Sequence, residues 1–276
     1  MKNAKEMVDN QYGVGDLLQK IETGLKSAGK DINSLKVDDL VPVDEFHTRG
    51  RKATREMAAL VKLKATDRVL DVGCGLGGTA RFLANEYKCS VIGVDLTEDY
   101  VTAGTKLTQL VNLSDKVGLR HGSALDLPFE DEEFDIVWTQ HVQMNIAEKD
   151  RFYAEIARVL KAGGRFLFHD VFRAGGDPPI YPVPWADDES MSVLVNETEA
   201  RAAIEDAGLA LDQWGEKVQE SVEFFDRVLT RIDAKGHPPL GIHLLLGVNA
   251  ENKFRNYARN LSEKRLSVAI GLAHKK

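Results

Sequence analysis

Apolar and polar positions between residues 68 and 170 follow two alternating periods. Short apolar runs that end at a glycine or a charged residue are typical of buried strands, and between them apolar residues recur at helical spacing. Strands that alternate with helices form a parallel sheet covered on both faces, so we expect an α/β fold. The expected strands are 69–72, 90–95, 116–121, 134–138 and 165–170, and the expected helices are 79–87, 98–111 and 148–160.

The last of these helices has the clearest pattern. Within 148–160, the side chains of Phe152, Ile156 and Val159 share one helical face. The residues Lys161-Ala162-Gly163-Gly164 follow directly and predict a helix stop, because glycine readily adopts the conformation that ends a helix.

The regions on either side of this core divide the chain. Residues 1–52 have helical patches separated by polar breaks, and we expect this segment to cover the ligand crevice of a main domain, 53–276. A loop rich in glycine and proline spans 173–188. The later elements expected are a helix at 198–207, a sixth strand at 209–214, a helical insertion at about 221–261 and a last strand at 266–273.

Composition narrows the possible partners. The net charge of -7 argues against broad nucleic-acid binding, which requires a basic face. The two cysteines, Cys74 and Cys89, lack metal-ligand spacing, so we expect neither a disulfide framework nor a metal site. No signal peptide or membrane-spanning run is visible, so we expect a cytoplasmic protein without membrane insertion. We expect the helical insertion either to enclose the substrate or to form the contacts of a homodimer.

A glycine-rich turn between the first strand and the first helix carries the most information. It reads Asp71-Val72-Gly73-Cys74-Gly75-Leu76-Gly77-Gly78. Its glycines fit a dinucleotide-binding turn, but Asp71 would repel a pyrophosphate. A ligand with an ammonium and a sulfonium would be attracted instead, and S-adenosylmethionine (SAM) is such a ligand.

Two later segments extend this site. Asp95 ends the second expected strand about 20 residues after Gly73, where a carboxylate can accept both hydroxyls of a ribose. The stretch 122–129, Gly-Ser-Ala-Leu-Asp-Leu-Pro-Phe, follows the third strand and can wall an adenine with apolar groups.

Together these segments resemble the class I SAM-dependent methyltransferases. The resemblance is strong over residues 68–170 and rests on five ordered motifs, which are 69–77, 94–95, 126–129, 134–138 and 158–164. It implies a Rossmann-like sheet of seven strands whose last strand is antiparallel, with SAM as cofactor and S-adenosylhomocysteine (SAH) as product. The cofactor-binding residues expected from it are Thr48, Asp71, Gly73, Cys74, Gly75, Asp95, Leu96, Ser123, Ala124 and Gln140. Many relatives have Asp where Ser123 stands.

The branch of the family is suggested by the N-terminal segment. Phe46-His47-Thr48-Arg49-Gly50 resembles small-molecule enzymes, above all the sarcosine/dimethylglycine and phosphoethanolamine N-methyltransferases. In the phosphoethanolamine enzymes an N-terminal Tyr works with a His after the fourth strand. Tyr12 matches that Tyr, but Asn145 stands where the His would be, so the dyad is not preserved. We expect His141 and Tyr12 to be the catalytic residues.

Several functions stay open. The expected reaction is methylation of an amine nitrogen in a small molecule, of the glycine-derivative or amino-alcohol type. O- or C-methylation of a phenol or quinol is the alternative, and an NAD-dependent oxidoreductase that uses Gly73, Gly75 and Gly78 is a second. A methyltransferase fold that serves only as a partner or regulator is a third. Arg49 and Arg173 are candidates for holding a substrate carboxylate or phosphate.

Overall fold

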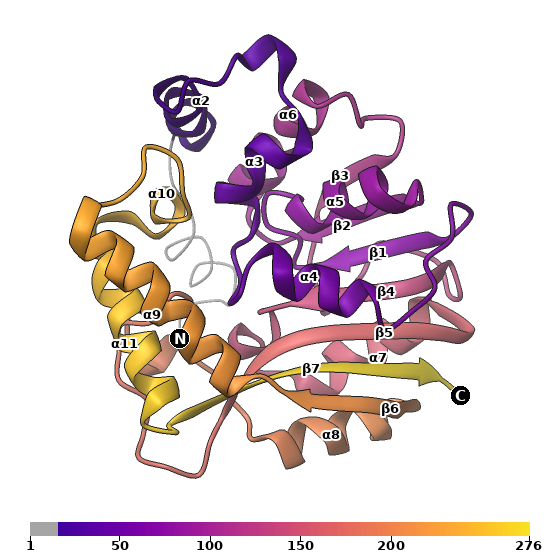
Figure 1. Cartoon of the computed structure of the whole chain (residues 1–276). Helices are drawn as coiled ribbons and strands as arrows, with labels where there is room; N and C mark the ends of the chain where they lie inside the picture. Colours follow the sequence, from indigo (N-terminus) through magenta and orange to yellow (C-terminus); the bar gives the residue numbers. More distant parts are fainter. Residues whose placement is uncertain (1–15) are drawn as a thin grey trace.

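A seven-stranded sheet forms the framework of the computed structural model, which describes residues 16–276 (Figure 1). Tyr12, one of the two expected catalytic residues, lies outside the described residues. The strands are β1 (Arg68–Val72), β2 (Ser90–Asp95), β3 (Val117–His121), β4 (Phe134–Gln140), β5 (Leu160–Arg173), β6 (Leu209–Glu216) and β7 (Leu266–Lys275).

The order of the strands determines where a ligand crevice is expected. It runs β3-β2-β1-β4-β5-β7-β6, and β7 is antiparallel to both of its neighbours. The chain winds outward in one direction from β1 and in the other from β4, so the strand order reverses between these two strands. In open α/β sheets, ligands bind at the carboxyl ends of the strands at this point.

The helices cover both faces of the sheet, and α9, α10 and α11 lie at one end of it (Figure 1). They are α2 (Leu17–Ser27), α3 (Val37–Asp44), α4 (Arg51–Ala58), α5 (Gly78–Tyr87), α6 (Glu98–Leu110), α7 (Lys149–Val159), α8 (Glu197–Asp206), α9 (Val218–Lys235), α10 (His243–Leu246) and α11 (Ala250–Ser262). Short 3-10 turns occupy Ile32–Ser34, Gln143–Asn145, Glu189–Met191 and Gly247–Asn249. In the described part of the chain, none of these helices is long and apolar enough to cross a membrane.

Alternation along β1 explains the two-sided core. Leu70 and Val72 pack with α7 and α8 on one face, whereas Val69 packs with α4 and α5 on the other. Asp71 shares the face of Val69 but lies near the carboxyl end of the strand, where it lines a cavity beside the start of α5. A polar residue in an otherwise apolar strand therefore faces the crevice.

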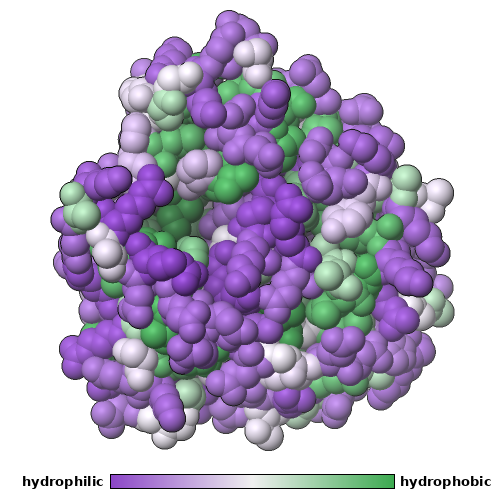
Figure 2. All heavy atoms as spheres, in the orientation of Figure 1, coloured by the Kyte–Doolittle hydropathy of each residue, from purple (hydrophilic) through white to green (hydrophobic). Residues whose placement is uncertain are grey.

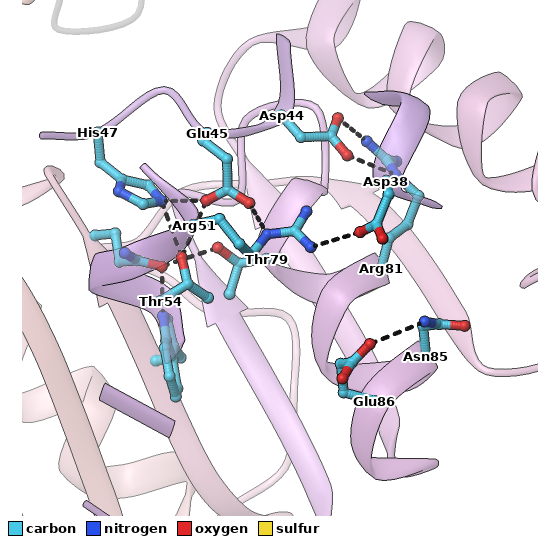
Figure 3. A network of polar contacts seen from close by, with 12 residues as sticks. Asp38, Asp44, Glu45, His47, Arg51, Thr54, Thr79, Arg81, Asn85 and Glu86 are labelled. Carbon is cyan, nitrogen blue, oxygen red and sulfur yellow. Dashed lines mark hydrogen bonds and ion pairs between the residues drawn. The ribbon is translucent and has the colours of Figure 1, made fainter. Parts of the chain in front are cut away.

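A buried ion pair attaches the N-terminal helices to this core. Arg81 of α5 is fully buried and binds Asp44, the last residue of α3, through two of its nitrogens (Figure 3). Its third nitrogen donates to Gly104 O at 3.1 Å and to Thr108 Oγ1 at 3.0 Å in α6. Burial raises the pKa of Asp44, and Arg81 opposes that shift. One guanidinium thus joins three helices beside the glycine turn.

The predicted elements are confirmed with one correction. All seven strands are present, the last is antiparallel, and 221–261 is helical apart from a break that includes Gly236 and Pro239. The helix expected at 148–160 ends where predicted, at Val159, but residues 161–164 do not cap it, because extended backbone begins at Leu160. Gly163, with φ +70°, lies instead in an irregular start of β5, where the pairing with β4 shifts register.

Candidate active site

A cavity of about 410 Å³ lies at the carboxyl ends of β1, β2 and β4. Nine of the ten expected cofactor residues line it. They are Asp71, Gly73, Cys74, Gly75, Asp95, Leu96, Ser123, Ala124 and Gln140. His141 also lines it, together with Val43, Asp44, Phe46 and His47 from the N-terminal segment. Residues far apart in the sequence therefore meet at the switch point of the sheet.

The glycine turn brings the backbone close to this cavity. Gly73 and Gly75 both have left-handed φ values, +71° and +54°. A Cβ on Gly73 would come within 2.4 Å of a methyl group of Val142, whereas a Cβ on Gly75 would meet nothing within 4 Å. Gly75 is thus required by its backbone conformation, and Gly73 by its close packing as well.

Asp71 is a buried carboxylate without a full set of partners. Its residue is 3% exposed, and its Oδ2 has no hydrogen-bond partner. Burial raises the pKa of Asp71 to about 8, and the nearby carboxylates of Asp95 and Glu45 add to the shift. Because an unpaired buried carboxyl is costly, the position suits a cationic group from a ligand.

Asp95 has a different environment at the end of β2. Its Oδ2 accepts a hydrogen bond from Gly75 N at 2.8 Å and its Oδ1 accepts one from Thr97 N at 2.9 Å. Burial raises its pKa, and these backbone donors oppose the shift. Each carboxylate oxygen keeps a further lone pair, so the side chain can still accept hydroxyl groups. Asp95 also fixes the shape of the glycine turn.

Gln140 is oriented by its neighbours. Its Oε1 accepts hydrogen bonds from Thr79 Oγ1 and from Trp138 Nε1, both at 2.8 Å. The amide nitrogen Nε2 is therefore free to point at a ligand, and it has no partner. Together with Asp71, Gln140 gives the cavity one unused acceptor and one unused donor, as a zwitterionic amino-acid group would require.

A second cavity of about 370 Å³ adjoins the first. His47, Phe46, His141 and Pro184 line both. Its other walls come from the N-terminal segment and from α9 and α11. Figure 2 shows hydrophobic residues at the bottom of a hollow beside α9 and α10. Thr48, the tenth expected cofactor residue, lies in this second cavity instead, and its hydroxyl donates to Tyr257 OH at 2.9 Å.

Three histidines cluster where the cavities meet. The ring centroids of His141 and His169 are 4.8 Å apart, and His47 lies 6.2 Å from the first and 5.8 Å from the second. His141 Nε2 and both ring nitrogens of His169 have no partner. Burial lowers the pKa of His141 and of His169 well below 6.5. Both imidazoles are therefore neutral at pH 7.

His47 is held by a carboxylate rather than left free (Figure 3). Its Nε2 lies 3.0 Å from Glu45 Oε2, and the hydroxyl of Thr54 donates to the same oxygen at 3.0 Å. Arg51 binds the other oxygen of Glu45. Burial alone would raise the pKa of Glu45, but His47 and Arg51 lower it to about 2. Glu45 is thus an ionised anchor that orients the His47 ring.

Neither Glu45 nor His169 was identified as a site residue from the sequence. Glu45 stands two residues before His47, and nothing in that spacing indicates that the two side chains touch. His169 lies within β5, and its ring reaches His141 because β4 and β5 are neighbours with Gln140 opposite His169. In the described residues, no group of three or more His, Cys, Asp or Glu side chains is arranged to hold a metal ion.

The fold and the first cavity define a protein that binds a nucleotide-type cofactor with an amino-acid group at the switch point of an α/β sheet. Residues 70–168 match a family model described as a methyltransferase domain. This part of the chain is a class I SAM-dependent methyltransferase domain, and SAM is the cofactor of this family. This confirms the predicted family, fold and cofactor, and it gives no support to an NAD-dependent oxidoreductase.

Several relatives have established names. A glycine/sarcosine/dimethylglycine N-methyltransferase of Actinopolyspora halophila is 34% identical over 129 residues, which are 47% of this chain and 23% of that one. A chloroplastic tocopherol O-methyltransferase of Arabidopsis thaliana is 36% identical over 104 residues, 38% of this chain and 30% of that one. The chain thus spans less than a third of either relative.

Two further proteins match over most of the chain. A sarcosine/dimethylglycine N-methyltransferase of Halorhodospira halochloris is 26% identical over 209 residues, 75% of this chain and 74% of that one. The solved structure of phosphoethanolamine N-methyltransferase 2 of Haemonchus contortus with SAM has a TM-score of 0.76 at 18% identity, and the match covers 100% of this chain and 60% of that one. The structural likeness at this identity concerns the fold.

Proposed function

We propose that this protein transfers the methyl group of SAM to a small-molecule acceptor in the second cavity, and that the methylated atom is an amine nitrogen. The observation that carries the proposal is the junction of the two cavities, which His47 and His141 both line. A cofactor in the first cavity and an acceptor in the second would meet at these side chains.

The cofactor would be held by side chains and backbone at the switch point. Asp71 and Gln140 fit its amino-acid group, and Asp95 fits its ribose. Ser123 and Ala124 fit the adenine, with Gly73, Cys74, Gly75 and Leu96 forming the floor. When bound, SAM supplies a methyl group on a sulfonium and leaves as SAH. The N-terminal segment contributes Asp44, Phe46 and His47 to the cavity wall, which supports its expected role as a cover.

His141 can act as a proton acceptor for the substrate. Its ring is neutral and its Nε2 has no partner. The backbone fixes its position, because His141 has φ 55° and its N–H donates to His169 O at 2.8 Å. A neutral imidazole in a buried junction can take the proton that an ammonium or a hydroxyl must lose before its lone pair attacks.

The choice of an amine rests on two of the relatives. The sarcosine/dimethylglycine enzymes methylate nitrogen, as their names state, and one of them matches three quarters of this chain. O- or C-methylation of a phenol or quinol is the second candidate. It is favoured by the aromatic and aliphatic lining of the second cavity and by the tocopherol O-methyltransferase relative.

Product detection by mass spectrometry tests the proposal. The protein is incubated with SAM and a panel of glycine derivatives, amino alcohols, phenols and quinols. A mass gain of one methyl group on an amine is the expected result, and a gain on a phenol or quinol selects the second candidate. SAH binding measured by calorimetry is the control. If SAH does not bind, the protein does not transfer methyl groups from SAM, and both candidates are refuted.

A further inference from the structure

Arg49 is buried in the second cavity with most of its donors unused. The residue is 5% exposed and lines the cavity. Its Nη2 binds Glu56, but its Nε and Nη1 have no hydrogen-bond partner. Buried guanidinium donors without partners cost free energy, because each has given up its hydrogen bonds to water. An arrangement of this kind is expected where a ligand supplies the missing acceptors.

The local structure holds Arg49 in this position. Its backbone has φ 69°, a left-handed conformation that few side chains adopt, at the turn that leads into α4. Glu56 lies in α4 and also binds Lys217, so this carboxylate is shared between two cations and cannot satisfy all donors of Arg49. Arg51 leaves its Nη2 without a partner beside the same cavity.

The rest of the second cavity is mainly apolar. Its wall toward α9 and α11 is mostly aromatic and aliphatic, with Arg231 and Tyr257 as its polar members; the apolar side chains are Phe224, Phe225, Val228, Ile232 and Phe254. Its volume of about 370 Å³ falls in the range of roughly 300–1,000 Å³ that holds drug-sized ligands. An acceptor as small and polar as a glycine derivative would leave this wall unused.

We infer that the acceptor is an organic acid with a mainly apolar body, and that Arg49 binds its carboxylate or phosphate group. This inference rests on the proposed function, because it treats the second cavity as the acceptor site. Planar guanidinium nitrogens suit the oxygens of both anions. The acid would lie at Arg49 and the apolar body against α9 and α11, while the methylated atom faces His141 at the junction with the first cavity.

A second arginine provides a matched control. Arg173 was an equal candidate in the sequence, but its side chain is 53% exposed and lies 4.0 Å from Glu199 at the surface. It lines neither cavity. Removing either arginine deletes one positive charge, so a general effect of net charge would appear in both variants. Only Arg49→Gln should weaken the binding of an acid in the cavity.

The test measures binding of acids and neutral counterparts to the full chain saturated with SAH. Calorimetry compares indole-3-acetate with indole-3-acetamide, and 1-naphthyl phosphate with 1-naphthol, which separates carboxylate from phosphate. We expect at least one acid to bind about 10- to 100-fold more tightly than its counterpart, as for a hydrogen-bonded ion pair. Arg49→Gln should abolish this preference and Arg173→Gln should keep it.

Three results would overturn the inference. They are equal binding of acids and counterparts, a preference that persists in Arg49→Gln, and failure of every acid to bind at millimolar concentration. In Arg49→Gln, Glu56 still forms its ion pair with Lys217, and Arg49 does not line the first cavity. We therefore expect SAH still to bind this variant. If that variant does not fold, Arg49→Lys keeps the charge without the planar group and should reduce the preference. An acid preference without methyl transfer to any acceptor would refute the proposed function and the role of the acid as methyl acceptor, and would leave only Arg49 as an acid-binding residue.

Discussion

Cofactor binding should release a proton from Asp71. Because burial and the neighbouring carboxylates raise its pKa to about 8, this side chain is mostly protonated in the free protein at neutral pH. The ammonium of the cofactor favours the ionised form. Asp71 must therefore lose its proton when the cofactor binds, and affinity should rise with pH up to about 8.

The size of this effect follows from the raised pKa. Each pH unit below it weakens binding up to about tenfold, or about 1.4 kcal/mol, since the protonated carboxyl must first ionise. Asp71→Asn removes the titration and the charge together. Loss of one charge-assisted hydrogen bond is worth about 1.5–3 kcal/mol, so we expect the variant to bind SAH roughly 10- to 100-fold more weakly.

Calorimetry with SAH checks both parts. The dissociation constant is measured between about pH 6 and pH 7.5, where the proposed titration is steepest. Buffers of different ionisation enthalpy report the proton released. The wild type should show a rising affinity and proton release, and Asp71→Asn should flatten the rise. An unchanged affinity and slope in the variant would show that Asp71 neither binds the cofactor nor titrates with it.

Three further predictions concern catalysis, stability and the glycine turn. His141→Ala should lower kcat/KM at least about tenfold while SAH still binds. At saturating SAM, His141 should stay neutral as pH falls through 6.5, because its pKa lies well below that value, so its titration should not reduce wild-type turnover in this range. Arg81→Met leaves a buried carboxylate unpaired and should cost about 3–5 kcal/mol in urea unfolding, whereas the surface pair lost in Arg68→Met should cost less than about 1 kcal/mol. Gly73→Ala places a Cβ within 2.4 Å of a neighbouring methyl group and should weaken SAH binding, whereas Gly118→Ala, whose Cβ meets nothing within 4 Å, should not.

The framework of this protein could be predicted because its signals are local. Apolar runs and helical spacing identify elements one at a time, and the glycine turn with Asp71 and Asp95 lies at strand ends that a parallel sheet brings together. The end of the helix at 148–160 was predicted correctly, but the place of the glycines at 161–164 in a strand was not. A pair of glycines ends a helix or distorts a strand, and only the pairing of β5 with β4 decides between the two.

The acceptor side depends on contacts that no local pattern records. Thr48 bonds to Tyr257, which is 209 positions further along the chain. Arg49 and Arg173 are the same residue type and were equal candidates in the sequence. Only the structure shows that Arg49 is buried and Arg173 is exposed. The histidine cluster depends on which strands are neighbours and on the left-handed turn at His141. Packing between distant segments, rather than periodicity, creates this half of the site.

Many of the buried polar atoms that lack a hydrogen-bond partner in the described residues lie at the two cavities, whereas those of Thr139 and Gln143 line neither. Those of Arg49, Asp71, Gln140 and His141 line the two cavities, and those of His169 lie against His141. Each such buried group costs about 1–3 kcal/mol, so the free protein is less stable here than its apolar core would allow. Ligands that satisfy these groups bind only the folded state and should raise its melting temperature. Because His47 and His141 line both cavities, an acceptor that orders them should also tighten SAH binding, and SAH should tighten acceptor binding by the same factor.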